Sequence, residues 1–252
     1  MKNLKLSFIV LMVLGMAACK KSNAPIMANQ ENTTDVAADL AVNSLSINSA
    51  GAIGNLNDVT YSANAKIKID SACSTVWKDS VSRNINVGSG YSYNYKANYS
   101  YELGCTTNLF NGSVTTTSTY TSSYIGPNLA TSSSGSSDFT ISGLRNPAGV
   151  VVSGQYTING DYKRSGSFQS KIDSTYNGTH NTDIVITNLK ISKLLPTIDS
   201  GSATITITGN MPKRGAFSYT GTIVFNGGNK ATLTLNGTVY ILDLLTGQRT
   251  RA

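Results

Sequence analysis

Alternation of polar and apolar residues along most of the chain is the feature that most constrains its fold. In stretches such as 203–211 and 231–241, every second residue is mostly apolar and Thr, Asn or another polar residue stands between. Successive side chains of a β-strand point to opposite faces of a sheet, so this period of two predicts strands with one apolar and one polar face. Residues 59–69 alternate in the same way and are predicted to be a strand.

Short turn sequences separate these strands and indicate antiparallel neighbours. The predicted turns are Gly88-Ser89-Gly90, Asn159-Gly160-Asp161, Asn177-Gly178 and Asn226-Gly227-Gly228-Asn229, and the serine-rich stretch 132–137 is interpreted as a loop. About ten to twelve strands follow from this spacing. Because a sheet with one apolar face must cover that face, we expect an all-β antiparallel meander of long strands. It would form a sandwich or a closed or partly open barrel.

One short helix is expected before the strands. Val36, Leu40 and Leu45 lie near one face of a helix over 35–45, and Asp35 is available as its N-cap. Residues 51–57 are interpreted as a glycine-rich connection into the first strand. No break in pattern suggests a second domain, so we expect residues 35–252 to form a single β-rich domain.

The N-terminus has the layout of a secretion signal. Lys2 and Lys5 precede an apolar run over 6–18, which is too short to span a bilayer and ends in Gly15-Met16-Ala17-Ala18-Cys19. These residues resemble the lipobox of bacterial lipoproteins, although Met16 stands where Leu is most common. The resemblance covers only the first nineteen residues. It implies cleavage after Ala18 and attachment of a diacylglycerol to the Cys19 thiol.

Attached acyl chains would hold the protein at a membrane, because each buried methylene contributes about 0.8 kcal/mol. In enterobacterial lipoproteins an Asp directly after the lipidated Cys retains the protein in the inner membrane, and Lys20 stands there instead. The resemblance therefore implies the outer membrane. The first acidic residue after the anchor is Glu31, so the early acidic cluster that directs some lipoproteins to the surface is lacking and a periplasm-facing position is favoured. Residues 19–34 are interpreted as the lipid anchor and a flexible tether.

Two further cysteines, Cys73 and Cys105, would lie in a compartment where disulfides persist. We expect them to pair, and closing this loop would stabilise the fold by roughly 3–4 kcal/mol in the chain-entropy model. Two free buried thiols are the alternative.

A ladder of tyrosines marks one face of one predicted strand. Its members share odd positions and alternate with polar residues: Tyr91, Tyr93, Tyr95, Tyr99 and Tyr101. Tyrosine packs well across strands, and Cys105 continues the same face, so we favour a core position. The functional alternative is an open aromatic platform for a glycan or lipid ligand.

Candidate catalytic residues are few. His180 is the only histidine, and it lies between two predicted strands with Asp183 nearby. A hydrolase would need these two residues and an unidentified Ser, but no G-x-S-x-G motif occurs, and a solvent-exposed turn histidine is the favoured interpretation. One histidine does not make a typical zinc site, no cofactor motif is present, and no catalytic carboxylate pair is indicated.

The net charge and the composition limit the classes of partner that the protein is expected to bind. Removing the signal leaves 18 basic and 13 acidic residues, a formal charge of +5, which does not favour nucleic acid for an exported protein. Three Asp-Ser sites, at Asp70, Asp79 and Asp173, resemble weakly the acceptors of an envelope O-glycosylation system. The sequence therefore predicts a non-catalytic, lipid-anchored envelope lipoprotein, structural or ligand-binding, whose partners are the membrane and a glycan or lipid ligand. An envelope hydrolase is the alternative.

Overall fold

The computed structural model of the protein describes residues 28–67, 75–86, 91–106, 109–144, 153–195 and 197–252. Three helices come first: α1 (Ala28–Leu45), the short 3-10 helix η2 (Ile47–Ser49) and α2 (Ala52–Lys66). Strands follow: β1 (Val76–Asn86), β2 (Ser92–Thr106), β3 (Leu109–Ile125), β4 (Leu129–Ser142), β5 (Gln155–Ser170), β6 (Asn177–Ser192), β7 (Ile198–Met211), β8 (Gly215–Gly227), β9 (Lys230–Leu235), β10 (Thr238–Asp243) and β11 (Gln248–Arg251).

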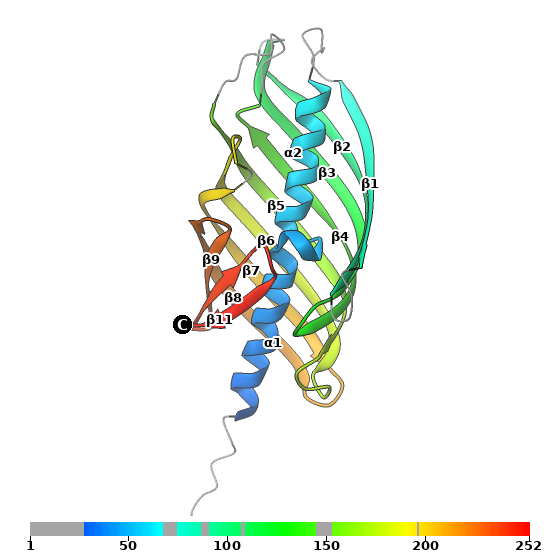
Figure 1. Ribbon diagram of the computed structural model, residues 1–252, viewed down its shortest axis with the longest axis vertical. Helices are drawn as coiled ribbons and strands as arrows, with labels where there is room; N and C mark the ends of the chain where they lie inside the picture. The colour runs from blue at the N-terminus through cyan, green and yellow to red at the C-terminus, as the bar shows by residue number, and fades with distance from the viewer. Residues whose placement is uncertain (1–27, 68–74, 87–90, 107–108, 145–152, 196) are drawn as a thin grey trace, which may run out of the picture.

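All eleven strands form one antiparallel meander in which each strand pairs with the next in sequence. The expected fold class is thereby confirmed. Within the described residues the two edge strands, β1 and β11, do not pair with each other, so the sheet stays open. It curves around α1 and α2, which follow one another along the hollow of the sheet (Figure 1). The result is a two-layer body with strands outside and helices inside.

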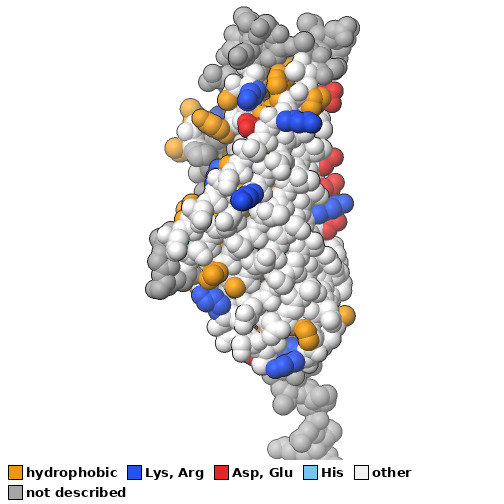
Figure 2. All heavy atoms as spheres, turned by 90° about the vertical axis from the view of Figure 1, so that its right-hand side faces the viewer, with side chains coloured by type: hydrophobic (Ala, Val, Ile, Leu, Met, Phe, Trp, Pro, Cys, Tyr) orange, Lys and Arg blue, Asp and Glu red, His pale blue; other side chains and the backbone are white. Residues whose placement is uncertain are grey.

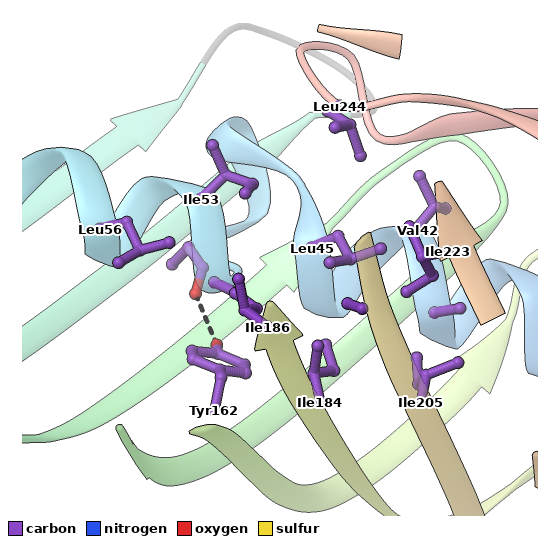
Figure 3. Close-up of a cluster of buried hydrophobic side chains, with 14 of the residues drawn as sticks. Val42, Leu45, Ile53, Leu56, Tyr162, Ile184, Ile186, Ile205, Ile223 and Leu244 are labelled. Atoms are coloured by element: carbon purple, nitrogen blue, oxygen red, sulfur yellow. Dashed lines mark hydrogen bonds between the residues drawn. The ribbon is translucent and has the colours of Figure 1, made fainter. Parts of the chain in front are cut away.

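The core lies between the concave face of the sheet and the helices (Figure 3). Leu45, Ile53 and Leu56 on the helical side are each at most 1 % exposed, and Ile184 and Ile205 face them from the sheet. Burying one such side chain contributes roughly 1.5–3 kcal/mol. The alternation in the strands therefore has its expected cause, because the apolar positions pack on the helices.

The outer face of the sheet carries mainly short, uncharged polar side chains. Thr117, Thr119 and Thr121 of β3 are exposed there, and Ser136 and Ser134 of β4 stand opposite the last two. Few charged or apolar side chains interrupt this surface on the side that Figure 2 shows. A solvated face of this kind explains the polar half of the alternation.

The strand predicted for residues 59–69 is wrong, because α2 occupies most of that stretch. Buried Ile53, Leu56, Val59 and Ala63 recur every three or four residues, which is the helical period. Tyr61, which shares the odd positions of Val59 and Ala63, is 81 % exposed. The predicted connection over 51–57 is likewise wrong, since α2 begins at Ala52.

Helix α1 confirms the predicted helix but starts earlier than expected. It begins at Ala28, so residues 28–34 of the predicted tether are helical. Asp35 lies inside the helix and is not its N-cap. Its Oδ1 accepts a hydrogen bond from the Tyr240 hydroxyl at 2.9 Å and lies 3.3 Å from Arg249. These contacts to β10 and β11 hold the first part of α1 on the sheet.

Two predicted irregular segments are strand. The serine-rich stretch 132–137 forms the middle of β4, where Gly135 faces inward between Tyr120 and β5. A Cβ at Gly135 would lie 2.3 Å from the Tyr120 hydroxyl, so the missing side chain makes room for that ring. The predicted turn at residues 159–161 is a bulge inside β5, with Gly160 at φ 139°. The turn over 226–229 is confirmed between β8 and β9, and the turn over 88–90 lies outside the described residues.

Candidate functional site

The histidine singled out in the sequence is buried, so its predicted place on a solvent-exposed turn is wrong. His180 belongs to β6, which already begins at Asn177, and is 1 % exposed. Its Nε2 lies 3.5 Å from the Ser133 hydroxyl and its Nδ1 lies 3.2 Å from the Thr182 hydroxyl. Asp183 is exposed on the opposite face of the sheet, because neighbouring side chains of a strand alternate. The His180–Asp183 pair that a hydrolase would need is not formed.

Electrostatics also make His180 a poor base. Burial, with the nearby Arg164 charge, lowers the pKa of its imidazole to about 3. The Arg164 guanidinium is 2 % exposed and donates to the Asn43 carbonyl at 3.0 Å and to the Thr131 hydroxyl at 3.2 Å. Asn43 lies in the last turn of α1, where the helix dipole is negative. Arg164 therefore acts as a buried cap on α1, and this cluster has a structural role.

The tyrosine ladder lies on the concave face of β2. Tyr93, Tyr95, Tyr99 and Tyr101 are 1–6 % exposed, while Tyr91 is half-buried. The first four belong to the core and offer no open platform.

The predicted disulfide and lipid sites fall largely outside the described residues. Cys105 is half-buried in β2, but Cys73 and Cys19 are not described, and neither is the predicted signal. Of the three Asp-Ser sites, Asp70 lies outside the described residues, Asp79 is in β1 and Asp173 is between β5 and β6. The pairing, the lipidation and the glycosylation stay predictions.

A cleft of about 690 Å³ opens beside the C-terminal half of α2. Strand β1 lines one side with Asp79 and Arg83, and the region where β5 begins and β6 ends lines the other with Tyr156 and Ile191. Its size is in the range of small-molecule sites, roughly 300–1,000 Å³. The C-terminal half of α2, which lines the cleft, lies toward the end of the molecule opposite the start of α1 (Figure 1).

Two polar atoms on the α2 wall of this cleft are buried and make no hydrogen bond with any described residue. They are the hydroxyl oxygen of Thr60 and the Oδ1 of Asn64. Thr60 is 6 % exposed. The two residues are four apart on a helix, which places them on the same face about 5–6 Å from each other. Leaving a buried polar group without a partner costs about 1–3 kcal/mol, so a water or ligand group that bonds to these two atoms would stabilise this wall.

An ion pair closes the end of the cleft that is nearer to β2. The Arg83 guanidinium donates to the Asp58 carboxylate, and the Tyr99 hydroxyl donates to the same carboxylate at 3.4 Å. Burial raises the pKa of the Asp58 carboxyl, whereas the Arg83 charge acts in the opposite direction. The hydrogen-bond network extends into the core, where the Tyr99 and Tyr95 hydroxyl oxygens are 3.0 Å apart. The Tyr95 hydroxyl also accepts a hydrogen bond from the Asn55 amide at 2.9 Å. This network fixes α2 on the sheet.

A second carboxylate faces the cleft from β1. Asp79 accepts hydrogen bonds from the Ser62 hydroxyl at 2.6 Å and from the Ser80 amide at 2.8 Å. These bonds lower the pKa of the Asp79 carboxyl below its usual value, the Ser62 bond most. Asp79 therefore remains an anionic acceptor at neutral pH.

Aromatic and aliphatic side chains border the opening. Tyr61 of α2 projects from it and Tyr156 lines the opposite wall, where the Lys193 ammonium lies 4.9 Å from the centre of its ring. The two residues after Lys193, Leu194 and Leu195, are 91 % and 67 % exposed in the connection to β7. The cleft thus combines hydrogen-bonding groups inside with apolar surface at its mouth.

Sequence reasoning did not find this cleft, because its groups come from α2, β1 and the end of β6. No local motif joins Thr60, Asn64, Asp79 and Arg83. A helical interpretation of residues 52–66 would have placed Thr60 and Asn64 together on one face.

In the described part of the chain, no cluster of three or more His, Cys, Asp or Glu residues is placed to hold a metal ion. No described helix combines the length and the apolar character needed to cross a bilayer.

Comparisons with known proteins gave no match for this chain among protein-family models, curated proteins or solved structures.

Proposed function

We propose that the protein is a non-catalytic lipoprotein of the cell envelope that binds a small ligand in the cleft between α2, β1 and the end of β6. The observation that carries the binding role is the α2 wall, where Thr60 and Asn64 present buried polar atoms without a partner in the described residues. A ligand that hydrogen-bonds to both atoms removes their desolvation penalty.

The geometry of the chain supports an anchored arrangement. A lipid on Cys19 would precede α1, and α1 begins at the end of the molecule opposite the C-terminal half of α2, which lines the cleft (Figure 1). A protein attached to the outer membrane in this way, facing the periplasm, would hold the cleft away from the bilayer. Dissolved ligands would then reach it without crossing the lipid surface.

Lipid attachment is tested by replacing Cys19 with Ala. We expect Cys19→Ala to abolish labelling by radioactive palmitate and to release the protein from the membrane fraction, because the acyl chains supply the attachment. Retained label in that variant contradicts the anchor.

Ligand binding is tested with an unlipidated chain, residues 20–252, which lacks Cys19 and contains every described element. A thermal-shift screen of sugars, fatty acids, amino acids and nucleotides is expected to give at least one stabilising compound, since a ligand that binds only the folded state raises its melting temperature. Ala65→Trp places an indole on an exposed lining position of the cleft and should abolish that shift. Thr119→Trp, exposed on the outer face of β3, is the matched control and should keep it. A shift that survives in Ala65→Trp places the ligand elsewhere.

A further inference from the structure

The polar pattern of the cleft specifies what its ligand must offer. Asn64 Oδ1 accepts hydrogen bonds only, whereas the Thr60 hydroxyl both donates and accepts. Asp79 of β1 accepts from Ser62, which lies on the opposite face of α2, so Thr60 and Asn64 set the pattern on their own side of the helix. The ligand must therefore carry several hydrogen-bond donors a few ångströms apart, together with acceptors. Hydroxyl groups around a ring meet this requirement, since each one both donates and accepts.

The aromatic rings at the opening of the cleft set a second requirement for the ligand. Tyr61 is 81 % exposed and Tyr156 lines the facing wall. Rings of this kind offer apolar faces next to polar tips. A ligand with both hydroxyl groups and C–H faces, such as a sugar ring, matches the two kinds of surface at once.

An acyl chain fits the cleft poorly despite the apolar rim. It would cover the unpartnered atoms of Thr60 and Asn64, and also Asp79 and Lys66, without giving any of them a hydrogen bond. Burial of polar groups without compensation opposes binding, and a charged group costs more than a neutral one. The rim residues Leu194 and Leu195 follow the cleft-lining Lys193 and are not themselves part of its wall.

We propose that the ligand of this cleft is a saccharide, held by hydrogen bonds to Thr60 and Asn64 and by contact of its ring with Tyr61 or Tyr156. This inference rests on the proposed binding function and names its ligand class. No bond in the saccharide is made or broken.

The test compares two probes on the unlipidated chain, residues 20–252: an immobilised oligosaccharide array and the fluorescent fatty acid cis-parinaric acid. Array binding is expected for the unaltered protein. Thr60→Val removes one hydrogen-bonding atom at nearly constant volume, and Asn64→Leu replaces both polar atoms of the amide by methyl groups on the same branched skeleton. Each substitution should weaken saccharide affinity about ten- to a hundredfold. Thr119→Val, the same change on the outer face of β3, should leave affinity unchanged.

The melting temperature of each variant shows whether a loss of affinity comes from lost binding contacts or from a damaged fold. The Thr60 hydroxyl has no partner among the described residues, so Thr60→Val should keep or raise the melting temperature while affinity falls. A purely structural Thr60 would leave affinity unchanged instead.

Three outcomes contradict the saccharide proposal. In the first, Thr60→Val and Asn64→Leu bind the array as well as the unaltered protein does. In the second, the protein binds cis-parinaric acid and not the array, and Ala65→Trp abolishes that binding. The cleft would then be a ligand site for acyl chains. If neither probe binds, the saccharide proposal fails, and the thermal-shift screen then decides whether the cleft binds any ligand.

Discussion

Protonation of the buried His180 should make the stability of the fold depend on pH in a specific way. The folded pKa of about 3 lies well below the ordinary value of 6.5. Between these two values the unfolded chain binds a proton that the folded chain does not. Stability from this group is therefore fully present above pH 6.5 and is lost progressively as pH falls toward 3.

The size of this effect follows from the two pKa values. One pKa unit corresponds to about 1.4 kcal/mol, so at pH 4.5, about two units below the ordinary value, His180 should cost roughly 3 kcal/mol relative to high pH. At pH 7 the corresponding cost is close to zero. His180→Gln keeps hydrogen-bonding groups near Ser133 and Thr182 but does not titrate, and should therefore escape a loss of roughly 2–3 kcal/mol between pH 7 and pH 4.5.

Urea unfolding of the mature chain and of His180→Gln at both pH values measures the difference, because the carboxylates contribute similarly to both proteins. Should His180→Gln fail to fold, the single histidine of the chain gives one imidazole resonance whose titration is followed by NMR. An equal loss of stability in both proteins, or an imidazole that titrates near 6.5, would refute the burial argument.

Two substitutions and one mass measurement test the core and the predicted disulfide. Tyr95→Ala removes a side chain that is 1 % exposed and should lower the free energy of unfolding by about 3 kcal/mol or more, measured by urea denaturation; a change below about 1 kcal/mol contradicts its core position. Gly135→Ala should destabilise by about 1–3 kcal/mol because the new Cβ would lie 2.0 Å from the Lys163 carbonyl oxygen and 2.3 Å from the Tyr120 hydroxyl, and an unchanged melting temperature would contradict this close packing of β4 on β5. For the predicted disulfide, mass spectrometry of the unreduced protein should find Cys73 and Cys105 in one linked peptide, whereas reaction of both thiols with iodoacetamide in the folded protein would rule the bond out.

Most of the sheet follows from the sequence because each strand buries one face against the helices. Alternation such as Ala203, Ile205 and Ile207 puts three apolar side chains on one face of a strand, and all three are buried in β7. The stretch 59–69 failed because Val59 and Ala63 satisfy both the strand period and the helix period. Leu56, at an even position, fits only the helix.

Polar strands and the cleft were harder to foresee for a different reason. Residues 132–137 contain no apolar side chain, so alternation could not identify them, and their place in β4 depends on pairing with β3 and β5. His180 looked like a turn residue because Asn177-Gly178 is a common turn sequence, yet these residues pair with β5. The cleft depends on the placement of α2 between distant strands, and no local pattern encodes that.

Native mass spectrometry of the protein isolated from its own cell envelope tests the ligand cleft most directly. The unaltered protein and Thr119→Trp are predicted to carry an additional mass that denaturation releases, because the Thr60 and Asn64 wall is completed by a bound molecule. Ala65→Trp is predicted to lack that mass while remaining folded. An unaltered protein without any bound molecule, or the same bound mass in all three proteins, would contradict the assignment of the cleft as the binding site.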